Sequence, residues 1–414
     1  MIMTSNHYLS LLEEEARELS DILHLTANEN ILSDFAAKAL NSNFSFRYHL
    51  GRIENFNTDN ITFSKGNIYR GIGLVNKLEE ISSKILNKRL GGVATEFRPL
   101  SGVYAMMCTI LSATDVGDYI LTIDPEKGGH FATQNIIEKT GRKSIKVPLK
   151  RETLAIDYDF ILEIKDKYTI KMFYIDDSLA CQPVDFSLLR QLLGEETILV
   201  YDASHPFGLI FAQEFMKPIY EGCDIIQANT HKTFPGPQKG IIHFSNSQLG
   251  NLVKDEVGKS LVSSQHTHHT IALHLAIIEM DEFSEDYVKK IIENTRYLYN
   301  LLTDKGFSIL EPKNKKELIT NQLYIRIPNF FDAEKIAKVF YANNISINIR
   351  RIFDENFLRI GLQEVTRLGF CTIEMDIISD IISNIIHDQN LESITKSIKR
   401  LNLQSRKILY SYDK

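Results

Sequence analysis

The sequence predicts an α/β protein with a large domain built on a mostly parallel sheet and a smaller α+β domain after it. Its 414 residues exceed one average domain, which favours this division. Short runs rich in β-branched residues alternate with helical stretches, a pattern typical of a parallel sheet with helices on both faces. The expected strands of that sheet are Tyr119–Ile123, Ser144–Val147, Lys171–Ile175, Ile198–Tyr201 and Asp224–Gln227.

The pattern changes after a long helical stretch near Thr270–Leu302. A helix at Asp332–Ala342 then lies among further short apolar runs, which indicates a second, smaller domain. These runs are Phe307–Leu310, Gln322–Ile327, Ile345–Ile349 and Phe357–Ile360.

The remaining segments complete the expected organisation. Residues 8–40 contain two helical segments separated by a loop at His24–Asn30, and residues 41–73 have an irregular pattern. We expect helices at Leu74–Asn87 and after Ser101-Gly102, and a basic amphipathic helix at Leu391–Lys407 whose charges fit a solvated face. The predicted domains are therefore an N-terminal helical arm (1–45), a large domain (46–285) and a small C-terminal domain (286–414).

Composition and charge argue against several classes of partner. The formal net charge of −6 disfavours nucleic acid or an anionic membrane as the main partner. No apolar run approaches the roughly 20 residues that span a bilayer. The segment from Met1 to Ser20 is polar and acidic, unlike a signal or transit peptide. The four cysteines lie far apart and form no CxxC pair, so we expect reduced thiols in a cytoplasmic protein.

Polar residues follow four of the expected strands, at the point where each strand ends. In open α/β sheets ligands bind at the carboxyl ends of the strands, so we expect these residues to share one edge of the sheet. They are Asp124 with Gly128-Gly129-His130, then Asp176-Asp177-Ser178, Asp202-Ala203-Ser204-His205 and Asn229-Thr230-His231-Lys232-Thr233.

This set matches the needs of pyridoxal 5′-phosphate (PLP). Lys232 could form the Schiff base with the aldehyde of PLP, and Asp202 could pair with the pyridinium nitrogen so that the ring withdraws electrons. The phosphate suits a Gly/Ser turn at a helix N-terminus, which Ser101-Gly102 offers. A flat group such as His130 could stack on the ring. The sequence therefore predicts a PLP site.

A metal site is the alternative for the histidines. His205 and His231, or the group His266, His268 and His269, could act as ligands. A metal would leave the acid, the lysine and the Ser-Gly turn unexplained, and no cysteine or acidic cluster supports it. We therefore expect no metal.

The motifs around these residues resemble those of the serine hydroxymethyltransferase family. Residues 200–240 contain VYDASHPFGL and, later, ANTHKTFPGPQKG. They are similar to the family's Asp-Met-Ala-His-x-x-Gly-Leu and Thr-Thr-His-Lys-Thr-x-x-Gly-Pro-x-Gly-Gly. Further similar segments are Leu25–Asn30, Arg47–Gly51, Gly128–His130 and Arg359–Gly369. The resemblance covers about residues 10 to 385 and implies fold type I of the PLP enzymes, the aspartate-aminotransferase-like fold.

The resemblance also implies which residues form the site. The expected cofactor-binding residues are Ser101, Gly102, His130, Ser178, Asp202, His205, Thr230, His231, Lys232 and Ser264. The expected catalytic residues are Lys232, His205, Tyr48 and Tyr69, and the expected substrate-binding residues are Asn28, Tyr48 and Arg359. Arg359 matches an arginine that binds the carboxylate of an amino-acid substrate, a task that suits a planar guanidinium.

A homodimer with shared active sites is implied as well. Tyr48 matches a tyrosine that enters the site of the partner subunit. Ser264 and Gln265 align with a Gly-Gly-Gln phosphate loop that the partner subunit supplies.

Four departures from the family pattern bear on the reaction. Leu50 stands where the family's Tyr-Ala-Glu-Gly has a glutamate, and leucine cannot carry a proton. Asn28 replaces a substrate-loop serine, and Ile68-Tyr69-Arg70-Gly71 replaces Arg-Tyr-Tyr-Gly-Gly. Residues 350–356 are shorter than the family's folate-facing loop.

These departures favour folate-independent chemistry at Cα of an α-amino acid, of the aldolase or transaldolase type on a β-hydroxy amino acid. One alternative is a tetrahydrofolate-dependent glycine/serine hydroxymethyltransferase, in which Arg70 or His49 takes over from the missing glutamate. Another alternative is an aminotransferase or a decarboxylase on the same scaffold. A non-enzymatic protein is disfavoured, because Lys232 and Asp202 are both present.

Overall fold

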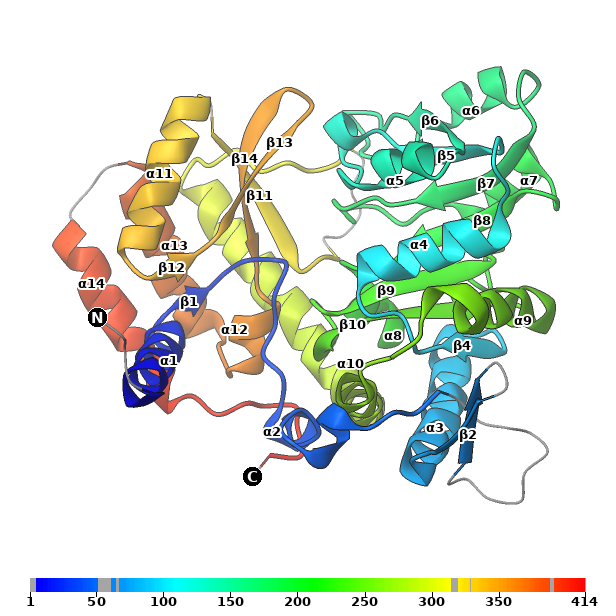
Figure 1. Ribbon diagram of the computed structural model, residues 1–414. Coiled ribbons are helices and arrows are strands. Elements are labelled where there is room, and N and C mark those ends of the chain that lie inside the picture. The colour runs from blue at the N-terminus through cyan, green and yellow to red at the C-terminus, as the bar shows by residue number, and fades with distance from the viewer. Residues whose placement is uncertain are drawn as a thin grey trace. The chain divides into compact units, whose positions relative to one another are not determined.

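The computed structural model describes residues 5–50, 61–64, 67–313, 319–327, 329–387 and 391–413. The chain forms two compact units (Figure 1). The large unit holds Asn30–Lys289, Glu311–Thr320 and Tyr410–Lys414, and the small unit holds Met1–Glu29, Lys290–Leu310 and Asn321–Leu409. The division into three domains, 1–45, 46–285 and 286–414, remains a prediction.

The large unit is built on a seven-stranded sheet in the order β4-β10-β9-β8-β7-β5-β6. Its strands are β4 (Ala94–Glu96), β10 (Pro235–Phe244), β9 (Ile225–His231), β8 (Ile198–Asp202), β7 (Ile170–Ile175), β5 (Tyr119–Ile123) and β6 (Lys143–Val147). The last five in the order pair in parallel, which confirms the predicted parallel sheet. Two strands were not expected, β4 and β10, and both pair antiparallel.

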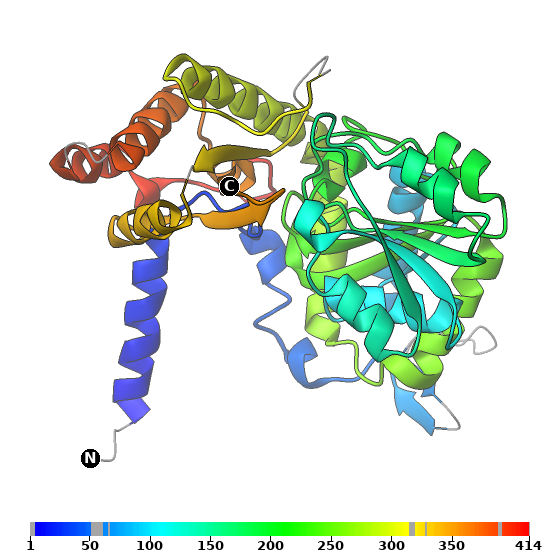
Figure 2. The same cartoon turned by 90° about the horizontal axis from the view of Figure 1, so that it is seen from above.

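Helices cover both faces of this sheet, as Figure 2 shows. The described α-helices of the large unit are α2 (Asp34–Ala37), α3 (Gly73–Leu90), α4 (Gly102–Ala113), α5 (Thr133–Lys139), α6 (Tyr158–Ile164), α7 (Phe186–Leu193), α8 (Phe207–Phe211), α9 (Ser247–Glu256) and the first part of α10 (Thr267–Asp304). A hairpin, β2 (Ile61–Ser64) and β3 (Asn67–Arg70), precedes α3. Met106 and Ile110 of α4 pack with Tyr174 of β7 and Val200 of β8 in one buried cluster. Burial on both faces explains why the central strands β5, β7 and β8 are almost continuously apolar.

The small unit contains a three-stranded antiparallel sheet in the order β11-β14-β13. Its elements are α1 (Ser5–Ser20), β1 (Leu23–His24), the end of α10, β11 (Gln322–Ile327), α11 (Phe330–Ala342), β12 (Ile345–Ser346), β13 (Asn348–Ile352), β14 (Glu355–Gly361), α12 (Gln363–Arg367), α13 (Thr372–Ile386) and α14 (Leu391–Leu401). The predicted strand Phe307–Leu310 makes only a single bridge, from Ile309 to Ile325. The predicted strand Ile345–Ile349 is divided between β12 and β13, because its first residues pair with β1 and its last residues pair with β14.

None of the helices in the described part of the chain is long and apolar enough to cross a membrane.

Candidate active site

The ends of β5, β7, β8 and β9 place most of the predicted cofactor residues around one pocket of the large unit. Strands β7, β8 and β9 are neighbours in the sheet (Figure 1). The predicted residues that line the pocket are Gly102, His130, Ser178, Asp202, His205 and Lys232. Val103, Met106, Asp176, Asp177, Ser204 and Asn229 line it too. An amine, carboxylates, imidazoles and a helix N-terminus therefore meet in one place.

Lys232 follows the last residue of β9 and is 9% exposed. Its Nζ atom lies 3.3 Å from Nε2 of His205. The Thr233 hydroxyl donates to the carbonyl oxygen of His205 at 2.5 Å, and the side-chain amide of Asn30 donates to the carbonyl oxygen of Lys232 at 2.6 Å. These bonds hold the backbone of the lysine on both sides, so its amine is presented to the pocket from a fixed position.

Asp202 ends β8, and its carboxylate is held by two donors. The Tyr174 hydroxyl donates to Oδ2 at 3.2 Å and the Ser204 amide donates to Oδ1 at 3.0 Å. Burial, and then the charge of Asp202, raise the pKa of Tyr174 well above its usual value, so the phenol keeps its proton and remains a donor. The Asp202 carboxylate is thus fixed in orientation at the pocket wall.

The N-terminus of α4 forms another wall. Ser101 caps the helix by accepting from the amide of Tyr104 at 3.2 Å, and the amide of Gly102 donates to Oδ1 of Asn229 at 2.8 Å. A Cβ atom on Gly102 would lie 2.4 Å from the Asn229 side chain, so this approach requires glycine. The amide groups and dipole of a helix N-terminus favour an anion.

His130 follows β5 and Ser178 follows β7, and Asp176 connects the two chain segments by hydrogen bonds. The buried Asp176 carboxylate accepts from the amides of Ile123 and His130, each at 3.0 Å, and burial raises its pKa to about 6. The Ser178 hydroxyl donates to the carbonyl oxygen of Gly128 at 2.7 Å. Asp176 therefore holds the turn that carries His130 against the sheet.

Six predicted residues of the large unit do not line this pocket, and one of them is Ser101, the N-cap of α4. The buried Thr230 hydroxyl donates to the carbonyl oxygens of Pro237 at 2.6 Å and Lys239 at 3.2 Å. His231 is half-buried and Ser264 is exposed. Tyr48 and Tyr69 are exposed, and their rings stack with centroids 6.2 Å apart.

Asn28 and Arg359 lie together in the small unit. Nη2 of Arg359 donates to Oδ1 of Asn28 at 2.7 Å and to Oδ1 of Asn348 at 2.9 Å. The side-chain amide of Gln363 donates to the carbonyl oxygens of Thr26 and Glu29 and so holds the loop that carries Asn28. Arg359 is 3% exposed, and burial lowers its pKa. Its Nε and Nη1 atoms are buried without a hydrogen-bond partner among the described residues, which suits an anionic ligand.

The donor set of the pocket fits PLP. With PLP bound here, Lys232 would supply the amine for its aldehyde, Asp202 would supply the acid for its ring nitrogen, and the start of α4 would suit its phosphate. Five residues to which the sequence assigned no role in the site also build it: Asn30, Tyr174, Asp176, Ser204 and Asn229. Asp176, Ser204 and Asn229 were already expected at this edge of the sheet, and Asn30 ends the motif Leu25–Asn30. Tyr174 lies inside an expected strand, where no sequence signal marks it.

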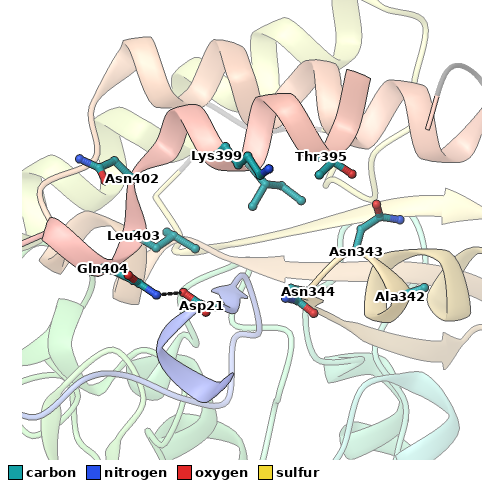
Figure 3. A pocket seen from close by; sticks show the side chains of 10 residues that line it. Asp21, Ala342, Asn343, Asn344, Thr395, Lys399, Asn402, Leu403 and Gln404 are labelled. Atoms are coloured by element: carbon teal, nitrogen blue, oxygen red, sulfur yellow. Dashed lines mark hydrogen bonds between the residues drawn. The ribbon is translucent and has the colours of Figure 1, made fainter. Parts of the chain in front are cut away.

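Figure 3 shows a separate groove in the small unit. Its lining is mostly polar, and it contains none of the predicted site residues. Among the described residues, no group of three or more His, Cys, Asp and Glu side chains is placed to hold a metal ion.

The chain is similar to known proteins over almost its whole length. The family described as serine hydroxymethyltransferase matches residues 3–382. A fluorothreonine transaldolase of Streptantibioticus cattleyicolor is 30% identical over 406 residues, which are 97% of this chain and 63% of that protein, so the chain spans less than two thirds of its length. A serine hydroxymethyltransferase of Archaeoglobus fulgidus is 28% identical over 424 residues, covering 99% of this chain and 94% of that protein.

A solved structure confirms the predicted fold. The crystal structure of an L-threonine transaldolase from Pseudomonas fluorescens, in its internal aldimine state, matches with a TM-score of 0.90 and 24% identity. The match covers 99% of this chain and 93% of that chain. The large and small units therefore have fold type I of the PLP enzymes.

Proposed function

Because this chain belongs to the serine hydroxymethyltransferase family and is a PLP-dependent enzyme, we propose that it breaks and forms the Cα–Cβ bond of a β-hydroxy-α-amino acid without folate. With threonine as donor, that bond breaks and acetaldehyde leaves. A second aldehyde then takes its place on Cα, and a new β-hydroxy amino acid results. The similarity to two proteins named as transaldolases supports this reaction class.

The observation that carries the proposal is the apolar side chain of Leu50 at the position of the family's glutamate. His49 does not supply the missing proton carrier, because both of its ring nitrogens are engaged. Nδ1 accepts from the amide of Ile72 at 3.2 Å, and Nε2 lies 3.0 Å from Oδ1 of Asn76. His49 is 1% exposed, and burial lowers its pKa. Arg70 is no substitute either, because a guanidinium only donates hydrogen bonds and has no acceptor atom for a proton.

The chain ahead of Arg359 supports the same conclusion. Strands β13 and β14 are joined by Phe353-Asp354, and Ile352 pairs directly with Glu355. Both turn residues have positive φ, of 53° and 60°, as a two-residue hairpin turn requires. Such a turn leaves no chain for a longer folate-facing loop.

Each side chain of the site has a role in this proposal. When bound, PLP withdraws electrons from Cα of the substrate. Lys232 would bind the aldehyde carbon, Asp202 would pair with the ring nitrogen and His130 would stack on the ring. Ser101 and Gly102 would hold the phosphate, and Ser178 and His205 would serve the ring oxygen and the substrate carboxylate. Arg359 and Asn28 hold the substrate carboxylate and so decide which bond at Cα aligns for cleavage.

We also propose that the active unit is a homodimer. Helix α1 buries none of its residues within the chain, although Tyr8, Leu9, Leu12 and Leu19 are large and apolar (Figure 2). Tyr48 and Tyr69 expose a stacked aromatic pair on the large unit. Apolar surface of this kind supports burial against a second subunit, to whose site Tyr48, Tyr69 and Ser264 then contribute.

The cytoplasm is the proposed location. All four cysteines are free, and burial raises the pKa of the Cys108 thiol to about 12. Thiols of this kind are unreactive and suit a reducing compartment.

The experiment is to supply threonine with an added aromatic aldehyde and to measure acetaldehyde and the new amino acid, with and without tetrahydrofolate. Production of both without folate is expected. Release of acetaldehyde and glycine without the new amino acid would indicate an aldolase instead.

The second candidate is a tetrahydrofolate-dependent hydroxymethyltransferase. The full-length similarity to the protein of Archaeoglobus fulgidus favours it. In that case serine, not threonine, is the donor, and conversion of serine to glycine requires folate.

A further inference from the structure

Lys239 lies in β10, is 1% exposed and donates only to backbone carbonyl groups. Its Nζ atom lies 3.2 Å from the carbonyl oxygen of Arg98, 3.0 Å from that of Pro99 and 3.1 Å from that of Gln265. An ammonium group has three N–H donors, so these three acceptors satisfy all of them. The charge is therefore buried in a shell of carbonyl oxygens.

This lysine has no counterpart in the motif that the surrounding residues resemble. The motif reads Gly-Pro-x-Gly-Gly, whereas this chain reads Gly236-Pro237-Gln238-Lys239-Gly240. A cation has thus been introduced where the motif has no side chain. The rest of the turn is ordered around it, because the Thr230 hydroxyl donates to the carbonyl oxygen of Lys239 at 3.2 Å.

The three carbonyl groups belong to segments that carry predicted site residues. Arg98 and Pro99 lie three and two residues before Ser101, which caps the start of α4. Gln265 follows Ser264, and its side-chain amide donates to the carbonyl oxygen of His49, next to Tyr48, at 2.5 Å. The ammonium of Lys239 therefore joins the Arg98–Gly102 segment to the Ser264–Gln265 segment directly. Through the side chain of Gln265 it is also connected to the Tyr48–His49 segment.

The packing of β10 against the first segment is close. The amide of Gly240 donates to the carbonyl oxygen of Pro99 at 3.2 Å. A Cβ atom on Gly240 would lie only 2.3 Å from the carbonyl oxygen of Ser101, so glycine is required there. The backbone of Ser101 is thus set by β10 from two adjacent positions, Lys239 and Gly240.

A carboxylate lies near Lys239 but is already engaged. The buried Glu96 accepts from the amide and from Nε of Arg98, each at 2.8 Å. Burial lowers the pKa of Lys239 to about 7, while Glu96 opposes and Arg98 adds to that shift. Converging carbonyl oxygens are also the ligands that replace water around a monovalent cation such as K⁺.

We propose that Lys239 is a positioning residue whose ammonium acts as a built-in monovalent cation, holding the Arg98–Gly102, Ser264–Gln265 and Tyr48–His49 segments in place. The expected effect of Lys239 on PLP affinity rests on the proposed function, in which Ser101 and Gly102 hold the phosphate. The expected effect of Lys239 on the order of the three segments does not depend on that function.

The first test compares Lys239→Met with Lys259→Met, which alters an exposed lysine. Methionine keeps the length of the side chain but removes the charge and all three donors. The Lys239 variant should melt a few degrees lower and bind PLP about tenfold or more weakly, since it leaves buried carbonyl groups unpaired. The Lys259 variant should match the wild type. Wild-type melting and wild-type PLP affinity in Lys239→Met would overturn the proposal.

The second test is rescue of Lys239→Ala, whose shortened side chain leaves the carbonyl shell without its cation. Ammonium chloride or potassium chloride, added to a buffer of N-methyl-D-glucamine chloride at constant ionic strength, should restore the melting temperature and the PLP affinity. The wild type and Lys239→Met should not respond, because their side chains fill the space. If Lys239→Ala does not fold, its refolding yield with and without ammonium replaces the melting curve.

Equal behaviour of Lys239→Ala in ammonium and in N-methyl-D-glucamine would also overturn the proposal. A failure of the proposed function has a different signature. If PLP does not bind at Lys232, the wild type itself shows no PLP affinity at this site, while the melting response of Lys239→Ala to ammonium remains measurable.

Discussion

Nζ of Lys232 and Nε2 of His205 lie 3.3 Å apart, although the two residues are separated by 27 positions in the chain. They meet because β8 and β9 are adjacent and parallel, so that the residues following each strand come to the same edge of the sheet. A buried amine beside an imidazole is suited to act as a nucleophile.

We predict that Lys232 is the residue that binds PLP covalently. The purified protein should show the visible absorbance of covalently bound PLP, and borohydride should fix the cofactor on Lys232 in a peptide map. Lys232→Ala should lose the label and the activity. A label on any other lysine would refute the assignment.

Asp202 and Tyr174 allow a graded test of the ring-nitrogen site. Asp202→Asn keeps the shape of the side chain but removes its charge, so PLP affinity should fall about 10- to 150-fold. Tyr174→Phe removes one hydrogen bond that orients the Asp202 carboxylate but leaves its charge in place, so PLP affinity should fall only about 2- to 10-fold. A larger loss of PLP affinity in Tyr174→Phe than in Asp202→Asn would contradict the assignment of Asp202 as the partner of the ring nitrogen. Titration of each apo variant with PLP gives the comparison.

Arg359→Ala should weaken binding of the amino-acid substrate by at least about tenfold, because a charge-assisted bidentate pair is lost. PLP affinity should not change. Arg359→Lys keeps the charge but not the fork of donors, so its affinity should lie between those of the wild type and the alanine variant. Spectral titration with glycine measures all three proteins, and unchanged affinity in Arg359→Ala would exclude this role.

If the sites are shared between two subunits, mixed dimers should regain activity. Lys232→Ala and Tyr48→Phe are each expected to be inactive alone. After verified subunit exchange, one site of each mixed dimer is intact, so the mixture should recover about one quarter of the wild-type activity under random exchange. An exchanged mixture that stays inactive would argue for sites contained within one chain.

Tetrahydrofolate should not stimulate turnover, because Leu50 cannot act as a general acid or base. The loss of such a group costs about 10²- to 10⁴-fold in a reaction that depends on it. Leu50→Glu offers the reverse test: it restores the family's carboxylate and should raise any folate-dependent conversion of serine to glycine, with no gain in reaction with threonine. Conversion of serine to glycine by the wild type only in the presence of folate would instead establish the hydroxymethyltransferase activity.

Much of the candidate site could be predicted from local pattern. Asp202, His205 and Lys232 each follow an apolar run, and the rule that ligands bind at the carboxyl ends of parallel strands was enough to group them. Ser101 was recognisable as a helix cap for the same local reason, since it directly precedes Gly102 and the apolar residues of α4.

The antiparallel strands were harder to predict. Residues 235–244 begin with Pro-Gly-Pro and contain Lys239, so they lack the alternation or the continuous apolar run that signals a strand. They form β10 because their backbone groups pair with β9, which precedes them in the chain. The hydrogen bond of Thr230 could not be predicted for the same reason. Its hydroxyl donates to the carbonyl oxygen of Pro237 in β10, a strand that the sequence pattern did not indicate.

The sequence by itself determined the fold class and the cofactor and predicted which lysine binds that cofactor, because strand periodicity and motif spacing are local properties that survive in a single chain. Only the tertiary structure decided which polar groups are buried and what satisfies them: Tyr174 on Asp202, Asp176 on the His130 turn and three carbonyl groups on Lys239. The physical reason is that a hydrogen bond between distant segments depends on where the packed backbone brings its atoms, and burial sets its strength.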